Sequence, residues 1–352
     1  ASLPAILTMK ILLTITSLLM STALLLVGHG MQLTLLPLRG ADNGMSAGLI
    51  GISASCYFLG FIVGCFLVPR LVARVGHIRS FSVLAALTAS TLLVLDMLDY
   101  WGFWLVLRFV TGVTMSGLYT LIESWLNSHT TAKNRGQVLA VYTFITLSSM
   151  AAGQIFVNVG SVDSSTPFSL AVLFMALAIV PIGLTRKIAP TPVESASPSF
   201  RLLYSRSHSA FAGAILSGLV SGSFWSLGAV FSSHYSDSLS DVSWFMMVAI
   251  AGGALLQYPI GWLSDRLDRR WVLILLSLGG ALSAFAVAFS VMTPWHLLMV
   301  FLFGATVMPI YAISLATAAD VASGEEFITI GTTILLLNAL GAAVAPIYLG
   351  QL

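Results

Sequence analysis

Long runs of apolar residues, separated by short segments rich in Gly, Pro and charged residues, recur from one end of the chain to the other. An α-helix needs about 20 apolar residues to cross the hydrocarbon core of a bilayer, and each run has about that length. The pattern therefore predicts an all-α membrane protein with eleven spans. We expect them near residues 10–37, 47–69, 80–98, 102–126, 137–159, 167–185, 209–235, 243–264, 271–291, 295–318 and 327–350. The first run is too long for a signal-peptide core and lacks a small-residue cleavage site, so we interpret it as a retained helix.

One long polar stretch interrupts this pattern. It is rich in Pro and Ser and begins at Lys187, which is typical of a linker between helical bundles. We predict an N-terminal six-helix bundle over residues 1–185, a cytoplasmic linker over 186–208, and a C-terminal bundle over 209–352 in which five spans are visible.

Composition agrees with lipid as the solvent. Hydrophobic residues make up 58% of the chain and charged residues 8%, whereas an ordinary soluble domain has roughly 25% charged residues. The net charge of +2 gives no indication of a nucleic-acid partner. Cys56 and Cys65 are expected on opposite faces of one helix, so neither a disulfide nor a metal site is predicted, and no cofactor is expected.

The distribution of Lys and Arg predicts the orientation. Thirteen of the fifteen basic residues fall in loops or helix ends on one side of the predicted membrane, leaving Arg39 opposite and Arg108 within a span. By the positive-inside rule, that side is cytoplasmic and carries the N-terminus and the linker. We expect a multi-pass protein of a bacterial inner (plasma) membrane.

A short motif occurs after the second span of each half. Residues 64–79 (GCFLVPRLVARVGHIR) are echoed by residues 261–270 (GWLSDRLDRR). The second copy resembles the signature cytoplasmic loop of the major facilitator superfamily. Further stretches resemble its YcaD-like branch: Gly76–Arg79, Ile122–Asn127, Asn134–Gly136, Gly252–Gly261 and Asn338–Gly341.

The resemblance implies two pseudo-symmetric six-helix bundles, a solute site near the membrane midplane and a transport activity. Members of this superfamily usually have twelve spans. Here a twelfth either lies outside the given sequence or is replaced by an additional membrane subunit. The first-half loop has Pro69 and no Asp where the signature usually carries an acid, so a gating acid would rest on Asp265 alone.

Two ionisable residues of the fourth span are candidates for substrate or proton binding, because charge inside a membrane is energetically expensive. Arg108 begins an Arg-x-x-x-Gly pattern that recurs in the family, and it could attract an anionic solute or interact with a proton-carrying acid. The alternative is a fixed ion pair with Asp96 or Asp99. Glu123 lies near the cytoplasmic end of the same span and either binds a proton or pairs with a loop cation as a gate; we favour the gate.

Polar groups of other spans complete the candidate set. His29 and Gln32 share a face of the first span, where a histidine could titrate near neutral pH or could simply pack against a neighbouring helix. The remaining candidates are uncharged side chains at membrane depth that could line a cavity or form interhelical hydrogen bonds: Gln154, Trp225, Gln257, Tyr311 and Asn338.

The cytoplasmic motif supplies candidate gating residues. A carboxylate such as Asp265 can accept hydrogen bonds at a facing helix N-terminus in one conformational state and lose them in another. The neighbouring arginines Arg266, Arg269 and Arg270 belong to the same cluster. Their alternative role is that of a positive-inside anchor.

No catalytic or ATP-binding motif occurs in the sequence, so we do not expect an enzyme. The leading hypothesis is a secondary active transporter that moves a small solute by alternating access and couples this movement to protons. The alternative is a membrane interaction or assembly protein that kept the fold without transport.

Overall fold

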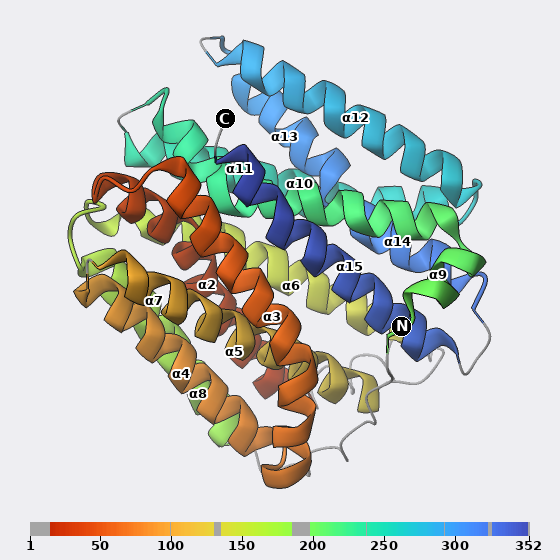
Figure 1. Ribbon diagram of the computed structural model, residues 1–352, viewed down its shortest axis with the longest axis horizontal. Coiled ribbons are helices and arrows are strands. Elements are labelled where there is room, and N and C mark those ends of the chain that lie inside the picture. The colour runs from red at the N-terminus through yellow and green to blue at the C-terminus, as the bar shows by residue number, and fades with distance from the viewer. Residues whose placement is uncertain are drawn as a thin grey trace, which may run out of the picture. The chain divides into compact units, whose positions relative to one another are not determined.

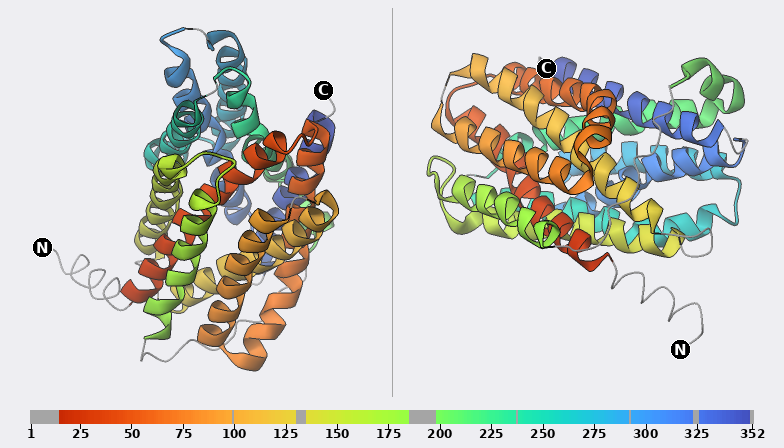
Figure 2. Two further views of the ribbon diagram at one scale, coloured as in Figure 1. Left: turned by 90° about the vertical axis from the view of Figure 1, so that its left-hand side faces the viewer. Right: turned by 90° about the horizontal axis from the view of Figure 1, so that it is seen from below.

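A computed structural model describes residues 15–98, 100–129, 135–184, 198–236, 238–291, 293–322 and 326–350. Figures 1 and 2 show coiled ribbon and no strand in these residues. Eleven helical segments are long and apolar enough to cross a membrane, and each coincides with a predicted span. The all-α fold and the number of spans are thus confirmed for the described residues. The start of the first predicted span, before residue 15, lies outside them.

The chain divides into two compact units, described separately below. Unit 1 comprises residues 1–35 and 60–194, and unit 2 comprises residues 36–59 and 195–352. Two helices contribute to both: α2 (Thr16–Asp42) and α3 (Ala47–Val75). The boundaries 1–185 and 209–352 stay a prediction, and most of the predicted linker lies outside the described residues.

Unit 1 is completed by a set of helices in which α4 packs on α5, α7 and α8. They are α4 (His77–Met97), α5 (Trp101–Ser128), α6 (Arg135–Phe156), the 3₁₀ turn η1 (Val157–Val159), α7 (Thr166–Leu177) and α8 (Ile179–Gly183).

Unit 2 contains a short helix and six longer ones, in which α10 packs on α15, and α13 packs on α11 and α12. They are α9 (Phe200–Arg206), α10 (His208–Ser233), α11 (Leu239–Ser264), α12 (Arg269–Ser290), α13 (His296–Val307), α14 (Pro309–Ala319) and α15 (Glu326–Leu349). α13 and α14 form one span that is interrupted at Pro309, which lacks a backbone N–H and fits the first turn of a helix.

Corresponding glycine contacts occur within each of the two units. At these positions two helices approach so closely that an added Cβ would meet the backbone of the facing helix. Two such contacts join α2 to α6, and two join α10 to α15. The residue numbers in the second pair of contacts exceed those in the first pair by one constant. The contacts are Gly30–Met150 and Gly153–Val27 in unit 1, and Gly218–Asn338 and Gly341–Ile215 in unit 2.

A second constant difference in residue number relates α3, α4 and α5 to α11, α12 and α13. Gly60 of α3 lies against the backbone of Phe109 in α5, and Gly252 of α11 lies in the same way against Phe301 in α13. At this shift the helix-capping residue Gly76 of α4 corresponds to Asp268 of α12. The pairs α2–α6 and α3–α5 of unit 1 therefore pack as the pairs α10–α15 and α11–α13 do in unit 2.

Candidate functional site

A buried polar cluster lies in unit 1, formed by His29 and Gln32 of α2 together with Arg108 of α5. All three side chains are at most 7% exposed. His29 Nδ1 lies 3.5 Å from Gln32 Oε1, and the guanidinium of Arg108 interacts electrostatically with the His29 ring. The Gln32 amide nitrogen has no hydrogen-bond partner in the described part of the chain. A buried donor without a partner is costly, so it indicates a position that a water or a ligand can fill.

Gln154, in contrast, uses its side chain to join helices. Its amide nitrogen donates to the Gly30 carbonyl at 2.8 Å, and its amide oxygen accepts from the Thr34 hydroxyl at 2.7 Å. Both groups of the fully buried amide are thus satisfied within unit 1. This geometry favours helix packing over solute binding.

Glu123 projects from α5 towards side chains of α3 and α6. Its carboxylate interacts electrostatically with Cys65 of α3 and with Tyr142 of α6. The Cys65 thiol lies 3.2 Å from the hydroxyl of Ser116. By its accessible surface Glu123 is exposed, although its helix is long and apolar enough to cross a membrane. Among the described residues it forms no salt bridge, and Lys133 of the following loop lies outside them.

The candidates of unit 2 are dispersed. Asn338 of α15 donates to Ser217 of α10 at 3.2 Å. Trp225 makes an edge contact with Phe224 at 5.0 Å, and Tyr311 packs at the edge of a buried apolar cluster. Gln257 of α11 is half-buried, and no hydrogen bond is found for its side chain within the described residues.

Because these helix pairs pack alike in the two units, the side chains at corresponding positions can be compared. The polar residues of unit 1 correspond to small or apolar residues of unit 2. The pairs are His29 and Ser217, Gln32 and Val220, Arg108 and Val300, and Glu123 and Leu315. Among the described residues, His29, Arg108 and Glu123 of unit 1 therefore have no ionisable counterpart in unit 2.

The charged motif of unit 2 at residues 261–270 is organised by Arg269, whose side chain joins three helices. The Arg269 guanidinium donates to Asp265 Oδ1 at 2.8 Å and to Asp320 Oδ2 at 2.7 Å. A third bond, of 3.1 Å, goes to the hydroxyl of Ser264. Arg269 therefore fastens the end of α11 and the end of α14 to the start of α12.

The other charged residues of the motif have separate roles. Asp268 caps α12 by accepting from the backbone N–H of Arg270 at 2.9 Å, which satisfies a free helix N–H. The guanidinium of Arg266 lies 3.6 Å from the centre of the Trp262 ring, a cation–π contact. The predicted latch of Asp265 against a facing helix stays a prediction.

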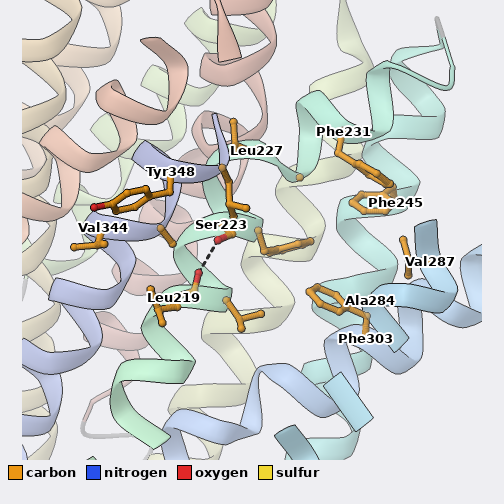
Figure 3. Close-up of a pocket in the computed structure, with 15 residues that line it drawn as sticks. Leu219, Ser223, Leu227, Phe231, Phe245, Ala284, Val287, Phe303, Val344 and Tyr348 are labelled. Carbon is orange, nitrogen blue, oxygen red and sulfur yellow. Dashed lines mark hydrogen bonds between the residues drawn. The ribbon is translucent and has the colours of Figure 1, made fainter. Parts of the chain in front are cut away.

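One groove of unit 2 is almost entirely apolar. It has a volume of about 590 Å³ and is lined by α10, α11, α12, α13 and α15. Figure 3 shows one hydrogen bond among its lining residues, from the Ser223 hydroxyl to the Leu219 carbonyl. An apolar lining is unsuited to a polar solute.

The region of unit 1 that corresponds to this groove is filled by α7. There α7 packs on α2 at Gly28, on α4, and on α6 through a ring contact of 5.0 Å between Phe156 and Phe174. The helices equivalent to α2, α4 and α6 are α10, α12 and α15, which line the groove. The groove thus lies where α7 would lie if unit 2 packed in the same way as unit 1.

Two participants in these clusters were not predicted from the sequence. Tyr142 lies near Glu123, and Asp320 pairs with Arg269. Asp320 is 51 residues from its partner, and only the tertiary packing of α14 brings them together. Cys65, which the sequence analysis considered for a disulfide or a metal site, lies near Glu123.

Comparison with known proteins places the chain among transporters. The family model described as Major Facilitator Superfamily matches residues 18–347. An Escherichia coli protein named "Uncharacterized MFS-type transporter YcaD" is 28% identical over 325 residues, which cover 91% of this chain and 83% of the relative.

Solved structures share the fold. The nucleoside transporter NupG has a TM-score of 0.77 at 13% identity, covering 96% of this chain and 90% of that chain. A D-xylose-proton symporter has a TM-score of 0.72 at 14% identity, covering 94% of this chain and 89% of that chain.

Proposed function

Because the chain belongs to the Major Facilitator Superfamily, whose members are carriers and not enzymes, we propose that it is a secondary active transporter. It exposes a solute site alternately to the two sides of a bacterial inner membrane and couples solute movement to protons. The N-terminus is cytoplasmic in this proposal, as the positive-inside rule indicates.

The buried cluster of His29, Gln32 and Arg108 carries this proposal. An arginine and a histidine inside membrane spans are retained at a cost, and function is the usual reason. The unpartnered Gln32 amide provides a donor for a solute or for a water that the solute displaces. An anionic group is the chemistry that Arg108 fits best, because its guanidinium stays protonated.

Glu123 and His29 are the proposed proton-binding residues, with Asp96 at the end of α4 as a third candidate. The exposed carboxylate of Glu123 lies beside Cys65 and Tyr142 and can exchange protons with water. A carrier needs a group that changes its protonation state during the cycle, and Arg108 does not.

Purified protein in liposomes that contain a pH-sensitive dye would test the function before the solute is known. We would add nucleosides, D-xylose and small carboxylates one at a time, because two similar structures are a nucleoside transporter and a D-xylose-proton symporter. A coupled solute changes the internal pH only in liposomes that contain the protein.

The variants Glu123→Gln, His29→Gln and Asp96→Asn then identify the coupling residue. Replacing the true proton site abolishes accumulation driven by a pH gradient and spares solute exchange, which needs no net proton movement. Retention of accumulation in all three variants would exclude these residues. If none of the solutes moves, the alternative of a membrane interaction or assembly protein without transport is favoured. The similar proteins give no support for an additional membrane subunit.

A further inference from the structure

A second cavity of unit 2 lies at the opposite end of α11 from the charged cytoplasmic motif. Its volume is about 480 Å³, within the roughly 300–1,000 Å³ typical of small-molecule sites. The ends of α10, α11, α12 and α13 converge on it. Its lining residues are Phe231, Ser232, Tyr235, Ser236, Asp241, Trp244, Phe245, Val291, His296 and Leu297.

Aromatic rings form most of the wall. Phe231 lies in the last turn of α10 and Tyr235 lies just beyond its end, with ring centres separated by 5.2 Å. Phe245 lies 6.0 Å from Phe231 and stacks on the ring of His296. Tyr235 and Trp244 are about half exposed, so parts of their rings remain available to a ligand. The face of an aromatic ring is negative and attracts cations.

A carboxylate lies at the same place. Asp241 precedes Trp244 by three residues and Phe245 by four, so all three share one face of α11. The Ser236 hydroxyl donates to Asp241 Oδ2 at 2.6 Å, which holds the carboxylate at the turn between α10 and α11. Asp241 remains exposed, and no arginine or lysine occurs among the described lining residues.

From this arrangement we propose that the cavity binds an ammonium group, quaternary or alkylated, against the rings of Tyr235 and Trp244 and the carboxylate of Asp241. Recognition of quaternary ammonium by aromatic cages rests on the same chemistry. The site is separate from the cluster of His29 and Arg108, so it goes beyond the proposed function. The ammonium can belong to a free solute or to the headgroup of a lipid such as phosphatidylethanolamine.

Calorimetry on the full-length protein in phosphatidylglycerol nanodiscs tests this site with choline and its uncharged isostere 3,3-dimethylbutan-1-ol. We expect choline to bind and the isostere not to bind. Asp241→Asn and Trp244→Leu should each weaken choline binding by about tenfold, whereas Trp244→Phe should retain most of it.

The matched control is Trp295→Leu. Trp295 is exposed at the start of α13, at the same end of unit 2, but does not line the cavity. It should leave choline binding unchanged. If Trp295→Leu weakens binding as much as Trp244→Leu does, both tryptophans act only as interfacial anchors and the site is overturned.

Two further outcomes distinguish the sources of the ligand. Loss of choline binding in nanodiscs that contain phosphatidylethanolamine supports the site with a lipid headgroup as its occupant. Unchanged binding supports a free ammonium solute. Equal binding of choline and the isostere, or no binding of choline in either lipid, would contradict the proposal, provided that thermal unfolding shows a folded protein.

Discussion

The side-chain amide of Gln154 in α6 donates a hydrogen bond of 2.8 Å to the backbone carbonyl of Gly30 in α2. The bond lies where glycine contacts bring the two helix backbones together. Unit 2 has Ala342 at the position that corresponds to Gln154, and there the methyl group simply packs against Gly222. Gln154 thus forms a polar clamp at this contact in unit 1, whereas in unit 2 the hydrogen bond between the two helices comes from Asn338, which donates to Ser217.

Replacing Gln154 with Leu should destabilise unit 1. The Thr34 hydroxyl would lose its side-chain acceptor, and we expect a loss of about 1–3 kcal/mol, as for other buried polar groups left without a partner. Thermal unfolding in detergent measures the effect as a lowered Tm. Gln257→Leu is the matched control and should leave Tm nearly unchanged. Equal effects of the two substitutions would show that Gln154 is not a structural clamp.

Apolar run length was enough to predict the eleven spans, because lipid leaves the chain few alternatives to helices. Arg108 and His29 could be identified as candidates for the same reason, since charge is rare in such spans. The sequence could not show that Gln154 is used for packing whereas the Gln32 amide nitrogen lacks a partner, because both are glutamines at membrane depth. That distinction depends on which helix faces each side chain, as does the pairing of Asp320 with Arg269.

Gly252→Ala should strongly destabilise unit 2. An added Cβ would overlap the carbonyl of Phe301, a backbone atom that can move only if α13 moves. Overpacking of this kind typically costs about 1–3 kcal/mol. Gly261→Ala on the same helix is the control, because no atom lies within 4 Å of the added group. A Tm reduced equally in both variants would point to helix flexibility, and not close packing, as the role of Gly252.

Arg269→Gln should weaken the contact of the C-terminal ends of α11 and α14 with the N-terminal end of α12. Asp265 and Asp320 are more than half exposed, so the ion pairs together contribute only about 1 kcal/mol. Ser264 is 1% exposed beneath the guanidinium and serves as the reporter.

In a chain with Cys56→Ser and Cys65→Ser, a cysteine introduced by Ser264→Cys should react about fivefold faster with a water-soluble maleimide when Arg269 is replaced. Arg270→Gln is the control, because the Arg270 side chain forms no ion pair in the described part of the chain. The same acceleration by Arg270→Gln would mean that the ion-pair network of Arg269 is not what protects position 264.

The last prediction concerns the hydroxyl pair that joins α4 to α5. Thr88 Oγ1 donates to Thr114 Oγ1 at 2.8 Å, and both side chains are at most 2% exposed. Each hydroxyl also has a backbone carbonyl within reach, that of Leu84 for Thr88 and that of Thr111 for Thr114. When either threonine is replaced by Val, the hydroxyl of the other therefore keeps a backbone acceptor. Each single replacement should lower the free energy of unfolding only slightly. In a double-mutant cycle, Thr88→Val and Thr114→Val should show a coupling of about 0.6 kcal/mol, the average for interhelical hydrogen bonds in a membrane.

Thr88→Val combined with Thr120→Val is the control. Among the described residues the Thr120 hydroxyl bonds only within α5, so those two effects should add. Additive effects in the first pair as well would mean that the contact between the two hydroxyls does not contribute to the stability of this helix pair.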